Sequence, residues 1–253
     1  MTDTLTDDCL LGGRVRFSQP SHGYRVAIDP VLLAAAVPAQ AGERVLDAGA
    51  GTGAASLCLA ARVPRCRIVG LELQRPLQRL ASQNVTQNEL DAQIEMIEGD
   101  LQRPPPRLAA ATFDHVMTNP PHLAATRASP SPDRQRALAH HETELDLAAW
   151  LAGCLRMLKQ GGLLTLIHRS DRLGDVLAAL PGRTGDVVVF PLWPAAGQPA
   201  KRVVVQGRKG SGGPLSLAPG LILHDQSGGY SPKAEEVLRH GRALDLGDGW
   251  RHA

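Results

Sequence analysis

Asn119, Pro120 and Pro121 are residues that could hold a planar nitrogen for transfer chemistry. They follow the strand-like run "FDHVMT", and two prolines end a strand because proline has no N–H to donate to a sheet. The lone pair of an exocyclic base amine, or of an amide, is delocalised and is therefore a poor nucleophile. The Asn119 side-chain oxygen and the Pro120 carbonyl could each accept one N–H, which would localise the lone pair and aim it at an electrophile. Both prolines restrict the backbone, so the direction of that carbonyl would be preset.

A simple turn is the alternative for these residues, because Asn-Pro commonly opens turns. A glycine-rich segment upstream, "VLDAGAGTGAAS" (45–56), favours chemistry instead. Small residues let the backbone approach a ligand closely, and the helix that follows offers free N–H groups.

The spacing within this segment points to S-adenosylmethionine rather than to a dinucleotide. A dehydrogenase uses a similar loop, but position six of the dinucleotide fingerprint is Ala54 here. Asp47 stands two residues before the first glycine, as in the acidic-x-Gly-x-Gly-x-Gly loop of methyltransferases. The residues that we assign to the cofactor from this loop are Asp47, Gly49, Gly51, Thr52 and Gly53.

Two acidic residues follow the next two expected strands. Glu72 is the second-to-last residue of "RIVGLEL" and lies nineteen residues beyond Gly53, where a carboxylate could accept both ribose hydroxyls of a cofactor. Asp100 ends "AQIEMIEGD" and could accept a hydrogen bond from the adenine amine. Ligands bind at the carboxyl ends of parallel strands, so we assign both acids, with Leu73 and Leu101, to the cofactor site rather than to solvated strand ends.

These residues require strands and helices in alternation. Strands are expected at 44–49, 67–73, 92–100, 113–120, 163–169, 186–193 and 201–209. Helices are expected at 27–38, with Asp29 as N-cap, at 55–63 and 76–89, at 147–158 before a Gly161–Gly162 stop, and at 170–182 with a Ser or Asp cap. No helix separates the last two strands, which therefore form a hairpin. The fold class is α/β: a Rossmann-like, doubly wound, mostly parallel seven-stranded sheet with an antiparallel terminal hairpin.

Three segments are expected along the chain. Residues 1–43 form an N-terminal extension with a lead-in helix packed on the cofactor site, 44–209 form the methyltransferase domain, and 210–253 form a C-terminal extension on the same domain. The polar loop that begins at His122 is long enough to act as a lid or substrate loop.

Composition excludes several classes of protein. Aromatic residues make up only 3% of the chain, which disfavours a stacking platform of several rings. Four cysteines show no CxxC spacing, so we expect neither zinc nor any other metal, and a cytoplasmic protein with reduced thiols. The apolar runs are far shorter than the roughly 20 residues of a membrane helix.

A net charge of +2 is too small to indicate nucleic-acid binding, but two stretches lack acids. A solvated surface and a phosphate-facing patch are both open readings of these stretches. The basic residues expected to contact RNA are Arg14, Arg16 and Arg25 in the first stretch and Lys201, Arg202, Arg208 and Lys209 in the second.

With these motifs in order, the chain resembles N6-adenine methyltransferases that carry an Asn-Pro-Pro-aromatic motif. More narrowly, it is similar to the bacterial family that methylates the adenosine beside the anticodon of a valine tRNA. The resemblance spans about residues 11 to 170 and rests on "FSQPSHGYRVAIDPVLLAA", "VLDAGAGTG", "EGD" and "TNPP". It implies that Asn119 to Pro121 hold the target amine and that Asp29 helps close the methionine end of the cofactor site.

His122 departs from the family, which has Tyr or Phe at this position. Imidazole could stack on a base with less area, could transfer a proton, or could simply occupy the loop. We therefore include His122 with Asn119, Pro120 and Pro121 as candidate catalytic residues.

Three other functions remain open. Protein-glutamine methyltransferases share the motif but usually carry a separate helical N-terminal domain, and only 43 residues precede the first expected strand. A small-molecule N-methyltransferase would make the basic stretches incidental. A non-catalytic methyltransferase-like module could bind RNA or protein without catalysis.

Overall fold

The computed structural model describes residues 5–22, 26–120, 147–180, 182 and 184–247. The strands after the N-terminal region are β3 (Arg44–Ala48), β4 (Arg67–Glu72), β5 (Ile94–Glu98), β6 (Phe113–Thr118), β7 (Leu158–Arg169), β8 (Thr184–Ala195), β9 (Arg202–Lys209), β10 (Ser216–Leu217) and β11 (Leu221–His224). The helices are α1 (Asp29–Ala36), α2 (Ala54–Arg62), α3 (Arg75–Gln87), α5 (Leu147–Met157), α6 (Leu173–Ala179) and α7 (Pro232–Leu238). The predicted α/β class is confirmed.

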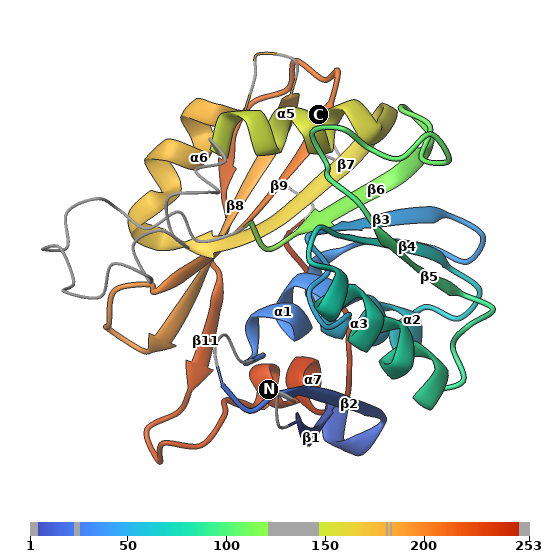
Figure 1. Cartoon of the computed structure of the whole chain (residues 1–253). Coiled ribbons are helices and arrows are strands. Elements are labelled where there is room, and N and C mark those ends of the chain that lie inside the picture. Colours follow the sequence, from blue (N-terminus) through green and yellow to red (C-terminus); the bar gives the residue numbers. More distant parts are fainter. Residues whose placement is uncertain (1–4, 23–25, 121–146, 181, 183, 248–253) are drawn as a thin grey trace, which may run out of the picture.

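These nine strands form one twisted sheet in the order β10-β8-β9-β7-β6-β3-β4-β5, with β11 also paired to β8 (Figure 1). All seven predicted strands are present. The predicted hairpin is also present, but its reversed strand, β9, lies inside the sheet and pairs antiparallel with both β7 and β8. The chain skips one strand position between β7 and β8, and the hairpin then returns β9 into that position. Two short strands that the sequence did not indicate, β10 and β11, extend the sheet beyond β8.

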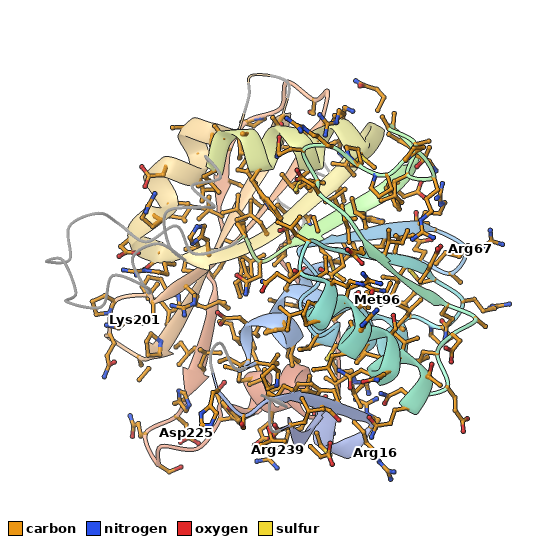
Figure 2. All side chains as sticks on the ribbon, in the orientation of Figure 1. Arg16, Arg67, Met96, Lys201, Asp225 and Arg239 are labelled. Atoms are coloured by element: carbon orange, nitrogen blue, oxygen red, sulfur yellow. The ribbon has the colours of Figure 1, made fainter. Side chains whose placement is uncertain are left out.

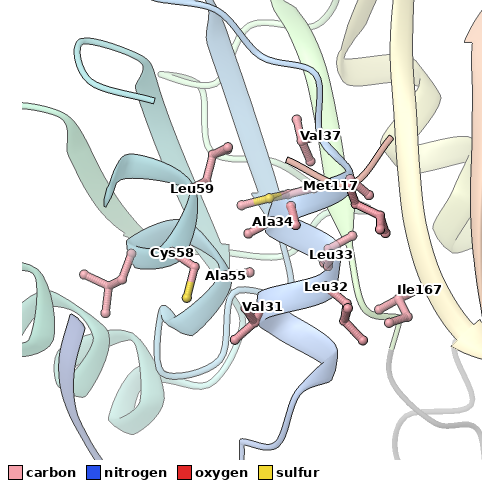
Figure 3. Close-up of a cluster of buried hydrophobic side chains, with 14 of the residues drawn as sticks. Val31, Leu32, Leu33, Ala34, Val37, Ala55, Cys58, Leu59, Met117 and Ile167 are labelled. Carbon is pink, nitrogen blue, oxygen red and sulfur yellow. The ribbon is translucent and has the colours of Figure 1, made fainter. Parts of the chain in front are cut away.

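Helices cover both faces of the sheet, as expected for a doubly wound fold. In Figure 1, α1, α2, α3 and α7 lie on one face, and α5 and α6 lie on the other. A separate cluster of buried hydrophobic side chains fills each interface. Figure 3 shows the first of these clusters, where residues of α1 face Cys58 and Leu59 of α2, Met117 of β6 and Ile167 of β7.

Helix α1 is buried along its whole length because the sheet, α2 and α7 surround it. Asp29 is not its N-cap as predicted. The N-cap is Ile28, and Asp29 is the first helical residue, followed by Pro30 in the first turn. The Asp29 carboxylate pairs with a distant arginine instead of capping its own helix.

Two other predicted boundaries are wrong for local reasons. Helix α5 ends at Met157, before Gly161 and Gly162, which lie in β7 where its pairing with β6 shifts register. An added Cβ on Gly162 would meet the Asp114 backbone oxygen at 2.9 Å, so this irregular pairing needs glycine. The helix predicted at 170–182 is a 3-10 turn, Ser170–Arg172, followed by α6, and α6 has no side-chain cap.

An N-terminal hairpin, β1 (Leu5–Leu10) and β2 (Val15–Pro20), was not predicted. The residues of β1 alternate between exposed and partly buried. Asn84 of α3 joins β2 to the glycine loop: its amide nitrogen donates to the Ser18 and Thr52 carbonyls at 3.0 and 2.9 Å. The hairpin is thus linked through Asn84 to the loop that the sequence assigns to the cofactor.

The C-terminal residues pack on α1. The Leu244 N–H donates to the Ala35 carbonyl at 2.8 Å, and Ser231 caps α7 by accepting from the Ala234 N–H at 3.2 Å. In the part of the chain that the structure describes, no helix is long and apolar enough to cross a membrane.

Candidate cofactor and amine site

The glycine loop and the amine motif leave adjacent parallel strands at the same edge of the sheet. Ala48, at the end of β3, pairs with Thr118, at the end of β6. The Thr118 hydroxyl donates to the Ala48 carbonyl at 2.8 Å, which fastens the two strand ends together. Gly49 and Asn119 are the next residues of their respective strands, so the structure brings these two predicted segments side by side. Pro120 is buried, while Pro121 and His122 lie outside the described residues.

Three glycines give the loop its shape. Gly49, Gly51 and Gly53 have φ values of +75°, +56° and +85°, a region that other residues rarely adopt. An added Cβ on Gly53 would meet Met96 Cε at 2.9 Å, whereas one on Gly51 would meet nothing within 4 Å. Gly53 is therefore closely packed, with Ala81 Cβ also only 3.3 Å from the added atom, and Gly51 presents its backbone to open space where a ligand could approach.

Glu72 holds this loop from the next strand. Its Oε2 accepts the Gly51 N–H at 2.9 Å, and its Oε1 accepts the Gln74 N–H at 2.9 Å. The side chain is 7% exposed. A carboxylate has about four lone-pair positions, so each oxygen can still accept one hydroxyl. The predicted acid thus lies beside the loop with its charge stabilised by two backbone donors.

Asp47 lies beneath the loop rather than in contact with open space. The residue is 2% exposed, and its carboxylate accepts a hydrogen bond from the Ser56 hydroxyl at 2.7 Å. Burial raises the pKa of Asp47 to about 6, although the hydrogen bonds from Ser56 oppose the shift. A negative charge held here at neutral pH favours a cationic ligand nearby.

Thr52 provides a test of whether the loop suits a polar ligand. Its hydroxyl oxygen is buried and has no hydrogen-bond partner among the described residues. Buried polar atoms are normally paired, because an unpaired one costs about 1–3 kcal/mol. With the open face of Gly51, this atom fits a loop that binds S-adenosylmethionine.

Asp100 and its neighbours lie just after the end of β5. The Gly99 N–H donates to the Glu72 carbonyl at 2.9 Å, which brings the end of β5 against that of β4. Asp100 Oδ1 accepts the Gln102 N–H at 2.8 Å, so the carboxylate is oriented by its own turn. Leu73 is 53% exposed and could cover a flat ring, but the Leu101 side chain is buried in the core and only its backbone could contact a ligand.

Asp29 is buried at the start of α1, and its carboxylate accepts from Arg202 Nε at 2.9 Å. The two residues are far apart in sequence, and the pair joins α1 to the beginning of β9. The structure therefore places Asp29 against an arginine that the sequence assigned to RNA.

Trp150 is a residue of the site that sequence reasoning missed. It lies in the first turn of α5 and donates its indole N–H to Thr118 Oγ1 at 3.0 Å. Its six-membered ring lies against Gly49, where an added Cβ would be 3.2 Å from Trp150 Cζ2. Trp150 is next to Leu151, a residue of the apolar stripe that predicted the helix. The chain has only three tryptophans, and this one follows a long polar segment; that position was the sequence signal that could have identified it.

The second basic stretch does not form one patch. In the strand register, Arg202 lies opposite Arg169 of β7 and Arg208 lies opposite Leu163. The stretch therefore runs the length of β9, from the carboxyl ends of the parallel strands to their amino ends. Lys201 and Arg202 lie at the carboxyl-end edge with Asn119. At the opposite edge, Arg208 donates to the Gly161 carbonyl at 2.8 Å and Lys209 to the Leu158 carbonyl at 2.7 Å. The four residues therefore do not form one continuous surface, and only Lys201 and Arg202 lie on the side of the sheet where Asn119 lies.

The first basic stretch is also partly engaged. Arg14 donates to the backbone carbonyls of Leu11 and Arg239, at 3.2 and 3.4 Å, and so ties the N-terminal hairpin to α7. The Arg16 side chain is exposed, and Arg25 lies outside the described residues. Figure 2 shows Arg16 and Lys201 well apart, with Arg67 at the right of the view, opposite Lys201.

Among the described residues, no group of three or more His, Cys, Asp or Glu side chains could hold a metal ion. Cys58, Cys66 and Cys154 are buried and Cys9 is exposed, and all four are free thiols. Burial raises the pKa of Cys66 to about 11, so this thiol is protonated at neutral pH.

Comparisons with known proteins agree with this geometry. A family model described as "Methyltransferase domain" matches residues 45–162. A tRNA1(Val) (adenine(37)-N6)-methyltransferase from Aeromonas hydrophila is 30% identical over 211 residues, which is 83% of this chain and 86% of that protein. A protein of the same name from Porphyromonas gingivalis is 30% identical over 230 residues, 87% of this chain and 89% of that protein. The chain belongs to the tRNA1(Val) (adenine(37)-N6)-methyltransferase family.

Solved structures agree on the fold of this methyltransferase. The crystal structure of a predicted O-methyltransferase from Agrobacterium tumefaciens matches with a TM-score of 0.72 and 26% identity, over 86% of this chain and 98% of that one. An S-adenosylmethionine-dependent O-methyltransferase from Thermotoga maritima matches with a TM-score of 0.55 and 16% identity, over 75% of this chain and 68% of that one. The protein is an S-adenosylmethionine-dependent methyltransferase with the Rossmann-like fold of that class.

Proposed function

We propose that this methyltransferase transfers a methyl group to the exocyclic N6 amine of an adenosine in tRNA. The observation that carries the proposal is the pairing of Ala48 with Thr118, which sets Asn119 and Pro120 beside Gly49 of the cofactor loop. Relatives named for adenine N6-methylation of a valine tRNA, similar over more than four fifths of the chain, support this substrate.

We assign the cofactor to the loop and the two strand ends beside it. Glu72 would accept the ribose hydroxyls, Asp100 would accept from the adenine amine, and exposed Leu73 would cover the adenine ring. Asp47 would stabilise the cationic end of the cofactor from below. The remaining contacts would come from the backbones of Gly49, Gly51, Thr52, Gly53 and Leu101, and from Asp29 at the methionine end.

Asn119 and Pro120 would supply two acceptors for the two N–H groups of the amine. Holding both would localise the nitrogen lone pair and direct it at the methyl carbon. The new N–C bond forms as the S–C bond breaks, sulfur keeps the electron pair, and the nitrogen loses one proton to solvent. This geometry suits nitrogen better than oxygen, because a hydroxyl has only one proton and would need a base to remove it.

RNA binding would use the carboxyl-end edge of the sheet. Lys201 is exposed at this edge and is our first candidate for a phosphate contact, with Arg16 further away on the N-terminal hairpin. Arg202 would contribute less, because Asp29 already balances its charge. The N-terminal hairpin and the C-terminal residues would belong to the same catalytic unit, and a tRNA substrate would place its action in the cytoplasm.

Transfer of labelled methyl from S-adenosylmethionine to total tRNA, followed by nucleoside analysis, tests the proposal. We expect N6-methyladenosine in tRNA. Label in protein glutamine or in a small metabolite, with none in RNA, would reject the RNA substrate and support one of the alternative N-methyltransferases. No binding of S-adenosylmethionine in calorimetry would instead support a non-catalytic module.

A further inference from the structure

The first turn of α5 contacts each of the three segments assigned to the reaction. Trp150 bonds to Thr118, the residue before Asn119, at 3.0 Å, and its ring lies against Gly49. The neighbouring Ala149 carbonyl accepts from Gln102 Nε2 at 3.0 Å, and the Gln102 backbone N–H in turn orients Asp100. One helical turn thus links the amine motif, the glycine loop and the strand end that would hold adenine.

The indole of Trp150 is well placed to set the distance between loop and motif. Thr118 Oγ1 accepts from the indole and donates to the Ala48 carbonyl, so a continuous chain of two hydrogen bonds runs from α5 to both strand ends. Helix α5 is itself fixed, because Leu151, Cys154 and Met157 are fully buried. The ring also limits how far Gly49 can move toward the helix.

We propose that Trp150 is a positioning residue, which fixes the spacing between the methyl donor in the glycine loop and the amine held by Asn119. The inference rests on the proposed function, since it concerns the geometry of the same methyl transfer. In-line attack needs the nitrogen and the methyl carbon at about 3–3.5 Å, and an error of about 1 Å can reduce the rate on the order of 100-fold. A residue that touches both sides controls this distance without touching either reactant.

The substitution Trp150→Phe separates this role from simple packing, because it keeps a ring against Gly49 but removes the N–H donor. We expect kcat to fall about tenfold or more while the Kd for S-adenosylmethionine changes less than about threefold. Trp193→Phe is the matched control: that indole donates to the Pro219 carbonyl at 3.1 Å, and its strand, β8, is separated from β6 by β9 and β7. Equal kcat values for Trp150→Phe and Trp193→Phe, with both proteins folded by circular dichroism, would overturn the proposal.

A double-mutant cycle tests the route through Thr118. Thr118→Val removes the acceptor for the indole, so adding Trp150→Phe to it should cost little further activity. If the two losses in log kcat simply add, Trp150 does not act through Thr118 and the positioning role is rejected.

Fluorescence tests the proposal even if a Trp150 variant does not fold. The double variant Trp193→Phe/Trp250→Phe leaves Trp150 as the single tryptophan of the chain. Its emission should change when S-adenosylhomocysteine is added, because the ring lies against Gly49; an unchanged spectrum at saturating ligand would count against it. This measurement needs no RNA, so failure of wild-type protein to methylate tRNA would reject the proposed function and leave the fluorescence result to decide on Trp150.

Discussion

The carboxylate of Glu72 accepts the backbone N–H of Gly51 at 2.9 Å, so the end of β4 holds the middle of the glycine loop. A residue assigned to the ribose therefore also shapes the loop that would bind the rest of the cofactor. Its other oxygen accepts the backbone N–H of Gln74, so each oxygen of the carboxylate accepts one backbone hydrogen bond. Loss of this carboxylate should disturb the loop as well as the ribose contact.

Glu72→Gln should weaken S-adenosylmethionine binding strongly. The amide keeps the size of the side chain but replaces one acceptor by an N–H₂ group that faces a donor. Hydrogen bonds to charged groups contribute about 1.5–3 kcal/mol, so we expect roughly a 10- to 100-fold rise in Kd by calorimetry. Glu95→Gln on β5, whose side chain is exposed and paired with Arg107, is the control and should bind as wild type. Equal affinities for the two variants would reject the role of Glu72.

Alanine at Gly51 and at Gly53 should produce different defects. Both positions have positive φ, which costs alanine about 1–2 kcal/mol. Only at Gly53 does the new Cβ also crowd its neighbours, with Met96 Cε at 2.9 Å and Ala81 Cβ at 3.3 Å. We expect Gly53→Ala to lower the melting temperature more, and Gly51→Ala to lose cofactor affinity with the smaller loss of stability. A thermal melt and a calorimetric titration of each variant check this. Wild-type cofactor affinity in Gly51→Ala would show that Gly51 does not face the cofactor.

The buried Asp47 carboxylate predicts a pH-dependent stability. Its folded pKa of about 6 lies above the ordinary value of 3.8, so the folded state holds this proton more tightly than the unfolded state. The resulting stabilisation is present below pH 3.8 and is lost as pH rises to about 6, a change on the order of 3 kcal/mol. Asp47→Asn should therefore gain stability relative to wild type between pH 4 and pH 6, in denaturant melts at several pH values.

Cofactor affinity should show the opposite trend at the same residue. Ionised Asp47 attracts the cationic end of S-adenosylmethionine, so wild-type affinity should fall as pH drops below about 6. Asp47→Asn should bind more weakly at pH 7.5, and its affinity should depend less on pH. A wild-type affinity that is flat from pH 5 to pH 7.5 would remove Asp47 from the cofactor site.

Asn119→Ala should abolish methyl transfer while the protein keeps its affinity for the cofactor. The substitution removes one of the two proposed acceptors for the amine and leaves β6 and Thr118 unchanged. We expect a fall in kcat of about 100-fold or more, the scale seen when one oriented donor or acceptor is lost from a site of this kind. Single-turnover transfer to tRNA measures it, with Kd for S-adenosylmethionine as the control. Wild-type kcat would exclude Asn119 from the amine site.

Lys201→Glu should weaken tRNA binding, because Lys201 is exposed at the edge of the sheet where Asn119 emerges. We expect KM for tRNA to rise several-fold and its dependence on salt to become less steep, with no change in Kd for S-adenosylmethionine. Arg67→Glu is the control, since this exposed residue starts β4 at the opposite edge (Figure 2). Equal effects of both reversals would indicate non-specific attraction rather than a binding surface.

The sequence by itself determined the order of strands and helices from β3 to β9, the glycine loop and the acids at the strand ends. These features follow from local rules: apolar runs of strand length, glycines that permit positive φ, and prolines that stop β6. For the same reason it predicted Asn119 and Pro120 as a pair of acceptors. The hairpin of β8 and β9 was predicted from a short connection with no helix.

Only the tertiary structure decided which residues meet across the sheet. Trp150 reaches Thr118 and Gly49 because α5 begins beside the carboxyl ends of β3 and β6, and Arg202 meets Asp29 because β9 inserts beside β7. The basic residues of β9 divide between two edges because an eight-residue strand spans the sheet. Such contacts depend on strand order and register, and these are set by packing between segments far apart in the chain rather than by any local pattern.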